Sequence, residues 1–163
     1  MTKTPQFETV KPMRKLYFPP LLQLLIYGIA GYIAAASIPE LAYRSAFSFW
    51  ASLTFGLMGM IILLASVRSF AKAGATVNPI EPEKAERLVT SGLYRFTRNP
   101  MYLGMLLVLL AAALAFQNIA AVIGPLLFFT SITLLQIIPE ERVLERTFGN
   151  AFATYRQQTR RWI

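Results

Sequence analysis

Four apolar stretches, each close to the length of a membrane-spanning helix, constrain the fold of this chain more than any other feature. They cover residues 21–38, 47–67, 100–117 and 119–138. A helix needs about 20 apolar residues to cross the ~30 Å hydrocarbon core of a bilayer, where its backbone must satisfy its own hydrogen bonds. The sequence therefore predicts an all-α integral membrane protein with four transmembrane helices, forming a single domain over residues 1–163.

The connection between the third and fourth stretches is very short. The only polar residues there are Gln117, which ends the third stretch, and Asn118, so the two helices are expected to form a tight hairpin. The third helix is predicted to start at Pro100, because proline is well tolerated in the first turn of a helix.

Composition limits the chemistry that this chain can perform. Its residues are 55% hydrophobic and 15% charged, which is too apolar for an ordinary soluble domain. There is no cysteine and no histidine, which excludes disulfides, thiol nucleophiles, histidine bases and any metal site built from those side chains. We therefore predict no metal site, and a catalytic site that relies on Glu, Arg, Lys, Tyr, amides, hydroxyls and backbone groups.

The basic residues, which give a formal net charge of +8, predict an orientation in the membrane. Every Lys and Arg except Arg44 lies before the first stretch, between the second and third, or after the fourth. Positive charge favours the cytoplasmic side, so both termini and the middle loop are predicted to be cytoplasmic. The membrane would be a bacterial or archaeal inner membrane, or one of endoplasmic-reticulum type. No nucleic-acid partner is predicted, because the charges flank apolar runs and no recognition fold fits.

The N-terminal segment has a second interpretation. Basic residues from Lys11 to Lys15, an apolar run and then small residues are also typical of a secretory signal. Because three further apolar stretches follow, a retained first span is the favoured prediction.

Two segments on the predicted cytoplasmic side, residues 76–102 and 139–163, are the candidate cofactor region. The first contains several prolines, which oppose a continuous helix. It ends in apolar residues that should pack on the rest of the protein. Arg95 and Arg98 could bind lipid phosphates there or hold an anionic ligand.

The second segment predicts an amphipathic C-terminal helix. Leu144, Phe148, Phe152 and Tyr155 recur at helical spacing and form an apolar stripe. Glu140 and Glu141 directly follow the fourth stretch. The membrane rim and a helix C-terminus are both unfavourable for a carboxylate, so a ligand or an arginine of the loop is the expected partner.

The motifs LVTSGLYRFTRNPMYLG and EERVLERTFGNAFATY, separated by the hairpin, resemble the isoprenylcysteine carboxyl methyltransferase family, which is itself similar to the phospholipid methyltransferases. The resemblance runs from Thr76 to Tyr155, about half of the chain. The matching positions are Gly92, Tyr94, Arg98, Asn99, Pro100, Tyr102, Gly104, Glu140, Glu141, Phe148, Gly149 and Tyr155.

The resemblance implies an integral-membrane methyltransferase that uses S-adenosylmethionine. This agrees with the absence of any G-x-G sequence, which a Rossmann-type cofactor loop requires. The cofactor-binding residues that it implies are Glu86, Arg87, Leu88, Val89, Tyr94, Asn99, Pro100, Met101, Tyr102, Glu140 and Glu141. The candidate catalytic residues are Arg98, Tyr102 and Gln136.

Physical chemistry suggests roles for several of these side chains. Glu140 can pair with the cofactor's ammonium group or accept from its ribose hydroxyls. Asn99 can hydrogen-bond the carboxylate or the adenine edge, and Tyr94 and Tyr102 can stack on adenine or face the sulfonium. Methyl transfer mainly needs alignment and desolvation, so the lack of histidine is no obstacle.

Two departures from the family pattern bear on the acceptor. Asn99 replaces the histidine of the motif, and Gln136 replaces an arginine four residues before the first glutamate. A carboxylate acceptor would lose its nearest cation unless Arg95 or Arg98 substitutes. A carboxylate, an amine, a thiol and another lipid group therefore all remain open as acceptors.

The prediction is thus a methyltransferase for a small lipophilic or lipid-like acceptor at the cytoplasmic membrane face, with the bilayer as its surroundings. Two alternatives remain. One is a membrane enzyme related to sterol reductases, with a nicotinamide cofactor, and the other is a non-catalytic membrane scaffold. The sequence carries no signal for an oligomeric state.

Overall fold

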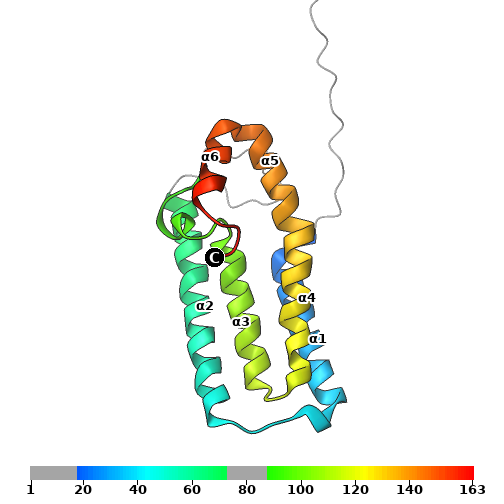
Figure 1. The fold of residues 1–163 in the computed structure, drawn as a ribbon. Coiled ribbons are helices and arrows are strands. Elements are labelled where there is room, and N and C mark those ends of the chain that lie inside the picture. The colour runs from blue at the N-terminus through cyan, green and yellow to red at the C-terminus, as the bar shows by residue number, and fades with distance from the viewer. Residues whose placement is uncertain (1–17, 73–87) are drawn as a thin grey trace, which may run out of the picture.

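Helices make up the computed structural model, which describes residues 18–72 and 88–163 (Figure 1). The α-helices are α1 (Pro20–Ser37), α2 (Ala46–Lys72), α3 (Pro100–Ala115), α4 (Ile123–Ile132), α5 (Ile138–Phe148) and α6 (Asn150–Gln158). Shorter helical turns are η1 (Pro39–Leu41), η3 (Gly92–Arg95), η4 (Ile119–Val122) and the π-helical η5 (Thr133–Ile137).

Three helical segments are long and apolar enough to cross a membrane. They are Pro20–Ser37, Ala46–Lys72 and the continuous run Ile119–Phe148. Large apolar side chains such as Phe47 and Ile61 are exposed on their outer faces, as expected for helices that contact lipid. The chain is therefore an integral membrane protein. With 16 residues, α3 rises only about 24 Å, so the count of four spans stays a prediction.

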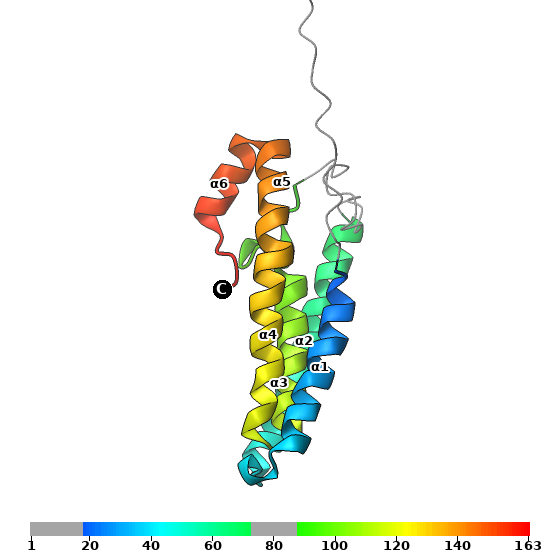
Figure 2. The same ribbon diagram turned by 90° about the vertical axis from the view of Figure 1, so that its right-hand side faces the viewer.

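The bundle pairs α2 with α3, and α1 with α4 and α3 (Figures 1 and 2). Glycines permit the close approach of the first of these pairs. A Cβ atom on Gly59 of α2 would lie 2.8 Å from the carbonyl oxygen of Gly104 on α3. Any side chain there would have to push the two helices apart. The buried core then fills the space between α3 and α4 and extends up to Tyr102.

The predicted hairpin and the predicted start of α3 are both confirmed. Pro100 occupies the first turn of α3, and α3 ends at Ala115. The side chain of Asn118 then caps the next helical turn by accepting from the backbone N–H of Ala120 at 2.8 Å. The hairpin is thus closed by local chemistry at the end of the bundle where Gln117 and Asn118 lie.

The fourth apolar stretch continues into the tail as one helical run, although it passes through the π-helical turn η5. Pro139 follows η5 and has no N–H to donate to the carbonyl four residues earlier, which favours such an irregularity. The expectation that Glu140 and Glu141 follow a helix C-terminus is therefore wrong. They lie inside the continuous run Ile119–Phe148, in the part named α5, so the penalty of a helix C-terminus does not apply to them.

The single amphipathic helix expected in the tail is two helices. Gly149, at a φ of +50°, ends α5, and α6 folds back from it (Figure 2). Of the apolar stripe, Phe152 and Tyr155 are buried, whereas Leu144 and Phe148 are half-buried. The stripe therefore packs on the protein, as predicted, but it does so around a turn.

Candidate functional site

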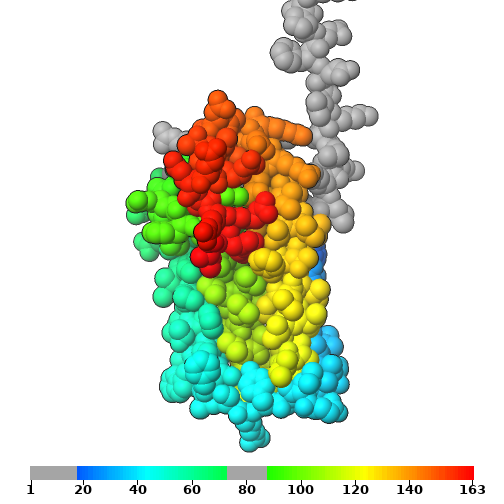
Figure 3. Space-filling view, viewed as in Figure 1, coloured from blue at the N-terminus to red at the C-terminus, as the bar shows by residue number. Residues whose placement is uncertain are grey.

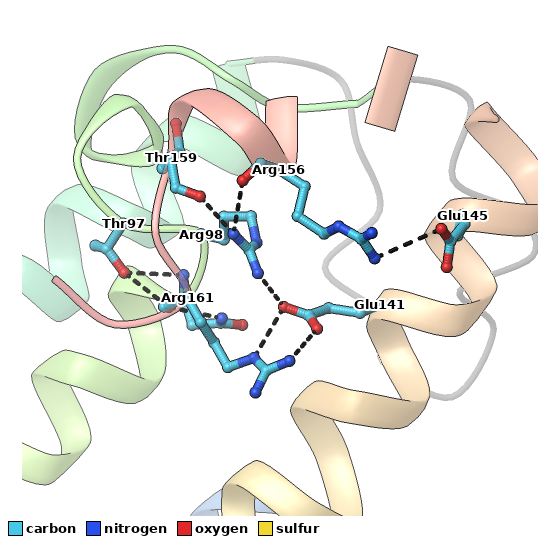
Figure 4. A network of polar contacts seen from close by, with 8 residues as sticks. Thr97, Arg98, Glu141, Glu145, Arg156, Thr159 and Arg161 are labelled. Carbon is cyan, nitrogen blue, oxygen red and sulfur yellow. Dashed lines mark hydrogen bonds and ion pairs between the residues drawn. The ribbon is translucent and has the colours of Figure 1, made fainter. Parts of the chain in front are cut away.

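Most of the predicted site residues that the structure describes gather at one end of the bundle. Loop residues 88–99, the first turns of α3 and α5, helix α6 and the tail segment Thr159–Ile163 meet there (Figures 1 and 4). The hairpin between α3 and α4 makes this possible. It returns the chain so that the start of α3 faces the start of α5, although about forty residues separate them in sequence.

Tyr102 and Glu140 form the first contact of the site. The hydroxyl of Tyr102 donates to Oε1 of Glu140 at 2.7 Å, and Tyr102 is buried in the core. Glu140 is half-buried, and no Lys or Arg within residues 18–72 or 88–163 forms an ion pair with it. A carboxylate in such surroundings is suited to a cationic ligand group.

Glu141 forms the second contact, an ion-pair network with two arginines (Figure 4). Nη2 of Arg98 lies 2.6 Å from Oε1 of Glu141. Arg161 binds the same carboxylate through both oxygens, with Nε donating to Oε1 at 3.1 Å and Nη2 to Oε2 at 2.7 Å. An arginine of the loop was one expected partner for an acid at this position. Arg98 confirms this for Glu141, and Arg161 of the tail is a second partner. The hydrogen bond to Glu141 also raises the pKa of Arg161, so the pair stays charged.

Arg98 is held almost entirely by protein groups. Its side chain is 9% exposed, and Nη1 donates to the carbonyl oxygens of Thr159 and Arg156. Within the described residues, its Nε atom is buried without a hydrogen-bond partner, and so is Nε1 of Trp162. Buried donors are normally bonded, so these two N–H groups are candidates to bind a ligand oxygen or nitrogen.

Asn99 joins the loop to the tail. Its Nδ2 donates to the carbonyl oxygen of Arg161 at 2.9 Å, and the hydroxyl of Thr97 donates to the same oxygen at 3.2 Å. Alongside, the backbone N–H of Arg98 donates to the carbonyl of Arg160 at 2.9 Å. Asn99 precedes α3 but its side chain does not cap that helix, and Oδ1 accepts no hydrogen bond from the residues that the structure describes.

Tyr94 lies on η3 at the edge of the site. Its ring packs edge-on against Phe70 with 5.1 Å between centroids, and Val89 joins the same small apolar cluster. Burial raises the pKa of the Tyr94 hydroxyl, with further increases from Tyr155 and from the carboxylate of Glu140. The Tyr155 hydroxyl donates to the carbonyl of Tyr94 at 2.6 Å, and burial raises its pKa to about 12. Both hydroxyls are therefore uncharged at neutral pH.

Gln136 lies deeper in the bundle, in contact with the chain that precedes α1. Its Nε2 donates to the carbonyl oxygen of Phe18 at 2.7 Å, and Gln23 donates to the same oxygen at 2.8 Å. Gln136 is 5% exposed, so this contact ties η5 to α1. The catalytic role expected for Gln136 stays a prediction.

The remaining predicted residues are placed as follows. Pro100 is buried at the start of α3, and Leu88 and Met101 are half-buried. Glu86 and Arg87 lie outside the described residues. The cofactor-binding roles assigned to this set also stay predictions.

Four residues of the site were not predicted: Thr97, Thr159, Arg161 and Trp162. Trp162 packs on the core cluster and lies against Phe129 of α4 with 4.9 Å between ring centroids. The sequence does carry a weak signal, because an Arg-Arg-Trp run is typical of a segment at a membrane interface. That signal predicts an interfacial position, but not a contact with Asn99 or Glu141.

A protein of Haemophilus influenzae, whose function is uncharacterized, is 43% identical over 63 residues, which are 39% of this chain and 100% of that protein. No solved structure matches the chain. A sequence profile described as phospholipid methyltransferase matches residues 47–151, which include α2, the hairpin and both carboxylates of the site. Because this match covers more than half of the sequence, the chain belongs to the phospholipid methyltransferase family.

Proposed function

We propose that this protein is an S-adenosylmethionine-dependent methyltransferase that acts on a lipid or a small lipophilic acceptor at the membrane surface. The observation that carries the proposal is the contact between Tyr102 and Glu140, 2.7 Å apart, in a member of the phospholipid methyltransferase family. That contact lies at the end of the bundle where the loop and the tail meet, which we place at the membrane rim. It places an acid with no cationic partner among the described residues beside an aromatic ring.

The chemistry of the side chains at this end fits the cofactor. Glu140 would hold its ammonium group, and the buried Nε–H of Arg98 is a donor for its carboxylate or for a ribose oxygen. Oδ1 of Asn99 would accept from the adenine amino group. The ring of Tyr94 or Tyr102 would face the adenine or the sulfonium. We assign Leu88, Val89, Pro100 and Met101 to the apolar wall of the same site. We also propose that Glu86 and Arg87, which lie outside the described residues, bind the cofactor.

S-adenosylmethionine supplies an activated methyl group, so the protein has only to align two reactants and exclude water. Buried rings and half-buried carboxylates at a membrane rim suit both tasks. The family supports a lipid acceptor, and a lipid can reach this rim directly from the bilayer. From the distribution of Lys and Arg, we further propose that this end faces the cytoplasm, where the cofactor is made available.

The acceptor group is the less constrained part of the proposal. Gln136 replaces the arginine that a carboxylate acceptor would use, and it donates to the carbonyl of Phe18. Both features favour an acceptor without a negative charge at the reacting atom, such as an amine.

The direct test is incubation of the purified protein with methyl-labelled S-adenosylmethionine and total membrane lipid, followed by identification of the labelled product. We expect label in a lipid. Calorimetry with S-adenosylhomocysteine and with reduced nicotinamide dinucleotide should accompany it, with binding of the first alone expected. Binding of the nicotinamide compound alone would contradict the proposal in favour of a reductase, and binding of neither would favour a scaffold.

A further inference from the structure

The tail segment that follows α6 contacts both polar arms of the proposed cofactor site, the loop arm at Asn99 and the helical arm at Glu141. We propose that Arg161 is a positioning residue that sets the orientation of these two side chains before the cofactor binds. The inference rests on the proposed function, which places Asn99 at the cofactor, and on the expectation from the sequence that Glu141 also belongs to the cofactor site.

The first step of the argument concerns the Arg161 side chain. Its guanidinium binds Glu141 as a two-pronged fork, through distances of 3.1 and 2.7 Å to the two carboxylate oxygens. A planar fork fixes the plane of a carboxylate, which a single-point contact does not do. Arg98 contacts only one of the two oxygens, so Arg161 is the residue that determines the rotation of the Glu141 carboxylate.

The second step concerns the Arg161 backbone. Its carbonyl oxygen accepts from Nδ2 of Asn99 at 2.9 Å, so the amide nitrogen of Asn99 is turned toward the tail. The amide oxygen Oδ1 is then turned away from the tail, where it can accept from a ligand. One residue therefore orients a carboxylate through its side chain and an amide through its main chain, at the two sides of the same site.

The third step concerns how Arg161 is itself held in place. The neighbouring residues anchor it, since the carbonyl of Arg160 accepts from the backbone of Arg98 and the ring of Trp162 packs on Phe129. In the space-filling view the tail lies across the upper ends of α3 and α4 (Figure 3). The close-up shows Arg161 reaching from this tail to Glu141 (Figure 4). Such fixed support is what a preorganised binding site needs.

Arg160 offers a matched control in the adjacent position. Its side chain is exposed and forms no ion pair or hydrogen bond with residues 18–72 or 88–163, so Arg160→Ala removes the same charge without touching Glu141. Arg161→Lys keeps the charge of Arg161 but loses the fork. Comparison of the three variants separates general electrostatic attraction from the orientation of the carboxylate.

The test is calorimetry of the purified full chain with S-adenosylhomocysteine, together with thermal unfolding of each variant without ligand. We expect Arg161→Ala to weaken binding about 10-fold, Arg161→Lys about 3-fold and Arg160→Ala less than 2-fold. If Arg161 acts through Glu141, then adding Arg161→Ala to Glu141→Gln should weaken binding less than 2-fold further. If Arg161→Ala does not fold, the affinities of Arg161→Lys and Arg160→Ala are compared instead. A larger loss in Arg161→Lys supports the inference, and equal affinities overturn it.

Two results would overturn the inference alone while the wild type still binds S-adenosylhomocysteine. One is equal affinity of the Arg161 and Arg160 variants. The other is a full 10-fold effect of Arg161→Ala in the Glu141→Gln background, because a merely structural or electrostatic role would act independently of that carboxylate. A wild-type protein that binds no S-adenosylhomocysteine would instead overturn the proposed function, and this inference with it.

Discussion

Asn118 and Asn99 precede helices at opposite ends of the bundle, but their side chains are bonded very differently. Asn118 donates to the carbonyl oxygens of Ala35 and Ile38 and accepts from the backbone of Ala120. Asn99 donates once, to a residue of the distant tail, and does not cap the helix that it precedes. An asparagine whose groups are all bonded to nearby backbone has a structural role. An asparagine whose side-chain oxygen accepts no hydrogen bond from residues 18–72 or 88–163 suggests a binding role.

The same contrast holds for the charged residues of the two ends. Glu40 and Arg44 are exposed at the end that holds Asn118, where the chain only turns between helices. At the other end, Arg98 and Glu141 are paired with side chains only 9% and 13% exposed. Burial of an ion pair contributes little net stability, so the fold alone does not require this pair. The difference identifies which end serves the fold and which end carries chemistry beyond it.

The largest predicted loss of affinity concerns Glu140, at the end of the bundle that holds the candidate site. Glu140→Gln keeps an oxygen that can accept from Tyr102 but removes the charge that would pair with the cofactor's ammonium group. Loss of a charged hydrogen bond costs about 2–3 kcal/mol, so binding of S-adenosylhomocysteine should weaken roughly 30- to 150-fold. Calorimetry measures this, and the thermal unfolding of the variant should match that of the wild type.

Glu145→Gln is the matched control for that change. Glu145 lies one helical turn further along α5, with its side chain 51% exposed and 3.5 Å from Arg156. Its substitution should change affinity less than 2-fold, because exposed pairs contribute little. Equal affinity of the Glu140 and Glu145 variants would contradict the assignment of Glu140 to the cofactor.

The next prediction tests the two asparagines directly. Asn118→Ala removes three hydrogen bonds and a helix cap, so it should lower the free energy of unfolding by about 2–3 kcal/mol. The affinity of the folded protein for S-adenosylhomocysteine should not change. Asn99→Ala should lower the free energy of unfolding by only about 1 kcal/mol but weaken binding about 10-fold. Denaturant unfolding in detergent measures the free energy of unfolding, and calorimetry measures the affinity. A loss of affinity in Asn118→Ala would contradict a purely structural role for Asn118.

Much of the fold could be predicted because apolar length and proline position act locally. The first helix was expected at residues 21–38 and is observed at Pro20–Ser37, and Pro100 begins α3 as predicted. The second helix continues to Lys72, five residues beyond its apolar stretch. Hydropathy indicates where a membrane begins, but a helix ends only where its backbone hydrogen bonds end. The expected single tail helix is two helices for a related reason, since Gly149 ends α5 at a positive φ, and the spacing of apolar residues does not reveal such a break.

Only those contacts of the candidate site that the hairpin between α3 and α4 brings together could be predicted from the sequence. Two segments on either side of a tight hairpin must meet, so the proximity of Tyr102 to Glu140 and of Arg98 to Glu141 followed from their positions at its two ends. The contact of Arg161 with Glu141 depends instead on the turn at Gly149 and on the path of the chain after α6. No regular spacing in the sequence determines that path, so Arg161 was counted only as a positive charge.

The smallest predicted effect concerns Tyr155, which joins α6 to η3 at the site end through its bond to the carbonyl of Tyr94. Burial raises the pKa of Tyr155 to about 12 from an ordinary value near 10, and Arg98 partly opposes this. Because the folded protein holds the proton more tightly than the unfolded chain, this stabilisation is complete below pH 10 and is lost as the pH rises through about 12. Tyr155→Phe should therefore cost about 1 kcal/mol at pH 7 and make the alkaline loss of stability less steep.

Tyr43, at the end that holds Asn118, provides the comparison for Tyr155, since its hydroxyl makes no hydrogen bond with the described residues. Tyr43→Phe should leave the stability at pH 7 unchanged, because it removes no hydrogen bond to the described residues. Denaturant unfolding of the two variants and the wild type between pH 7 and pH 12 measures the stability and its pH dependence. Tyr94 also carries a raised pKa, so Tyr155→Phe should reduce the alkaline slope without abolishing it. An unchanged slope in Tyr155→Phe would mean that this hydroxyl does not anchor the tail to η3, and that Arg161 is held by the contacts of the tail with Thr97, Asn99 and Phe129.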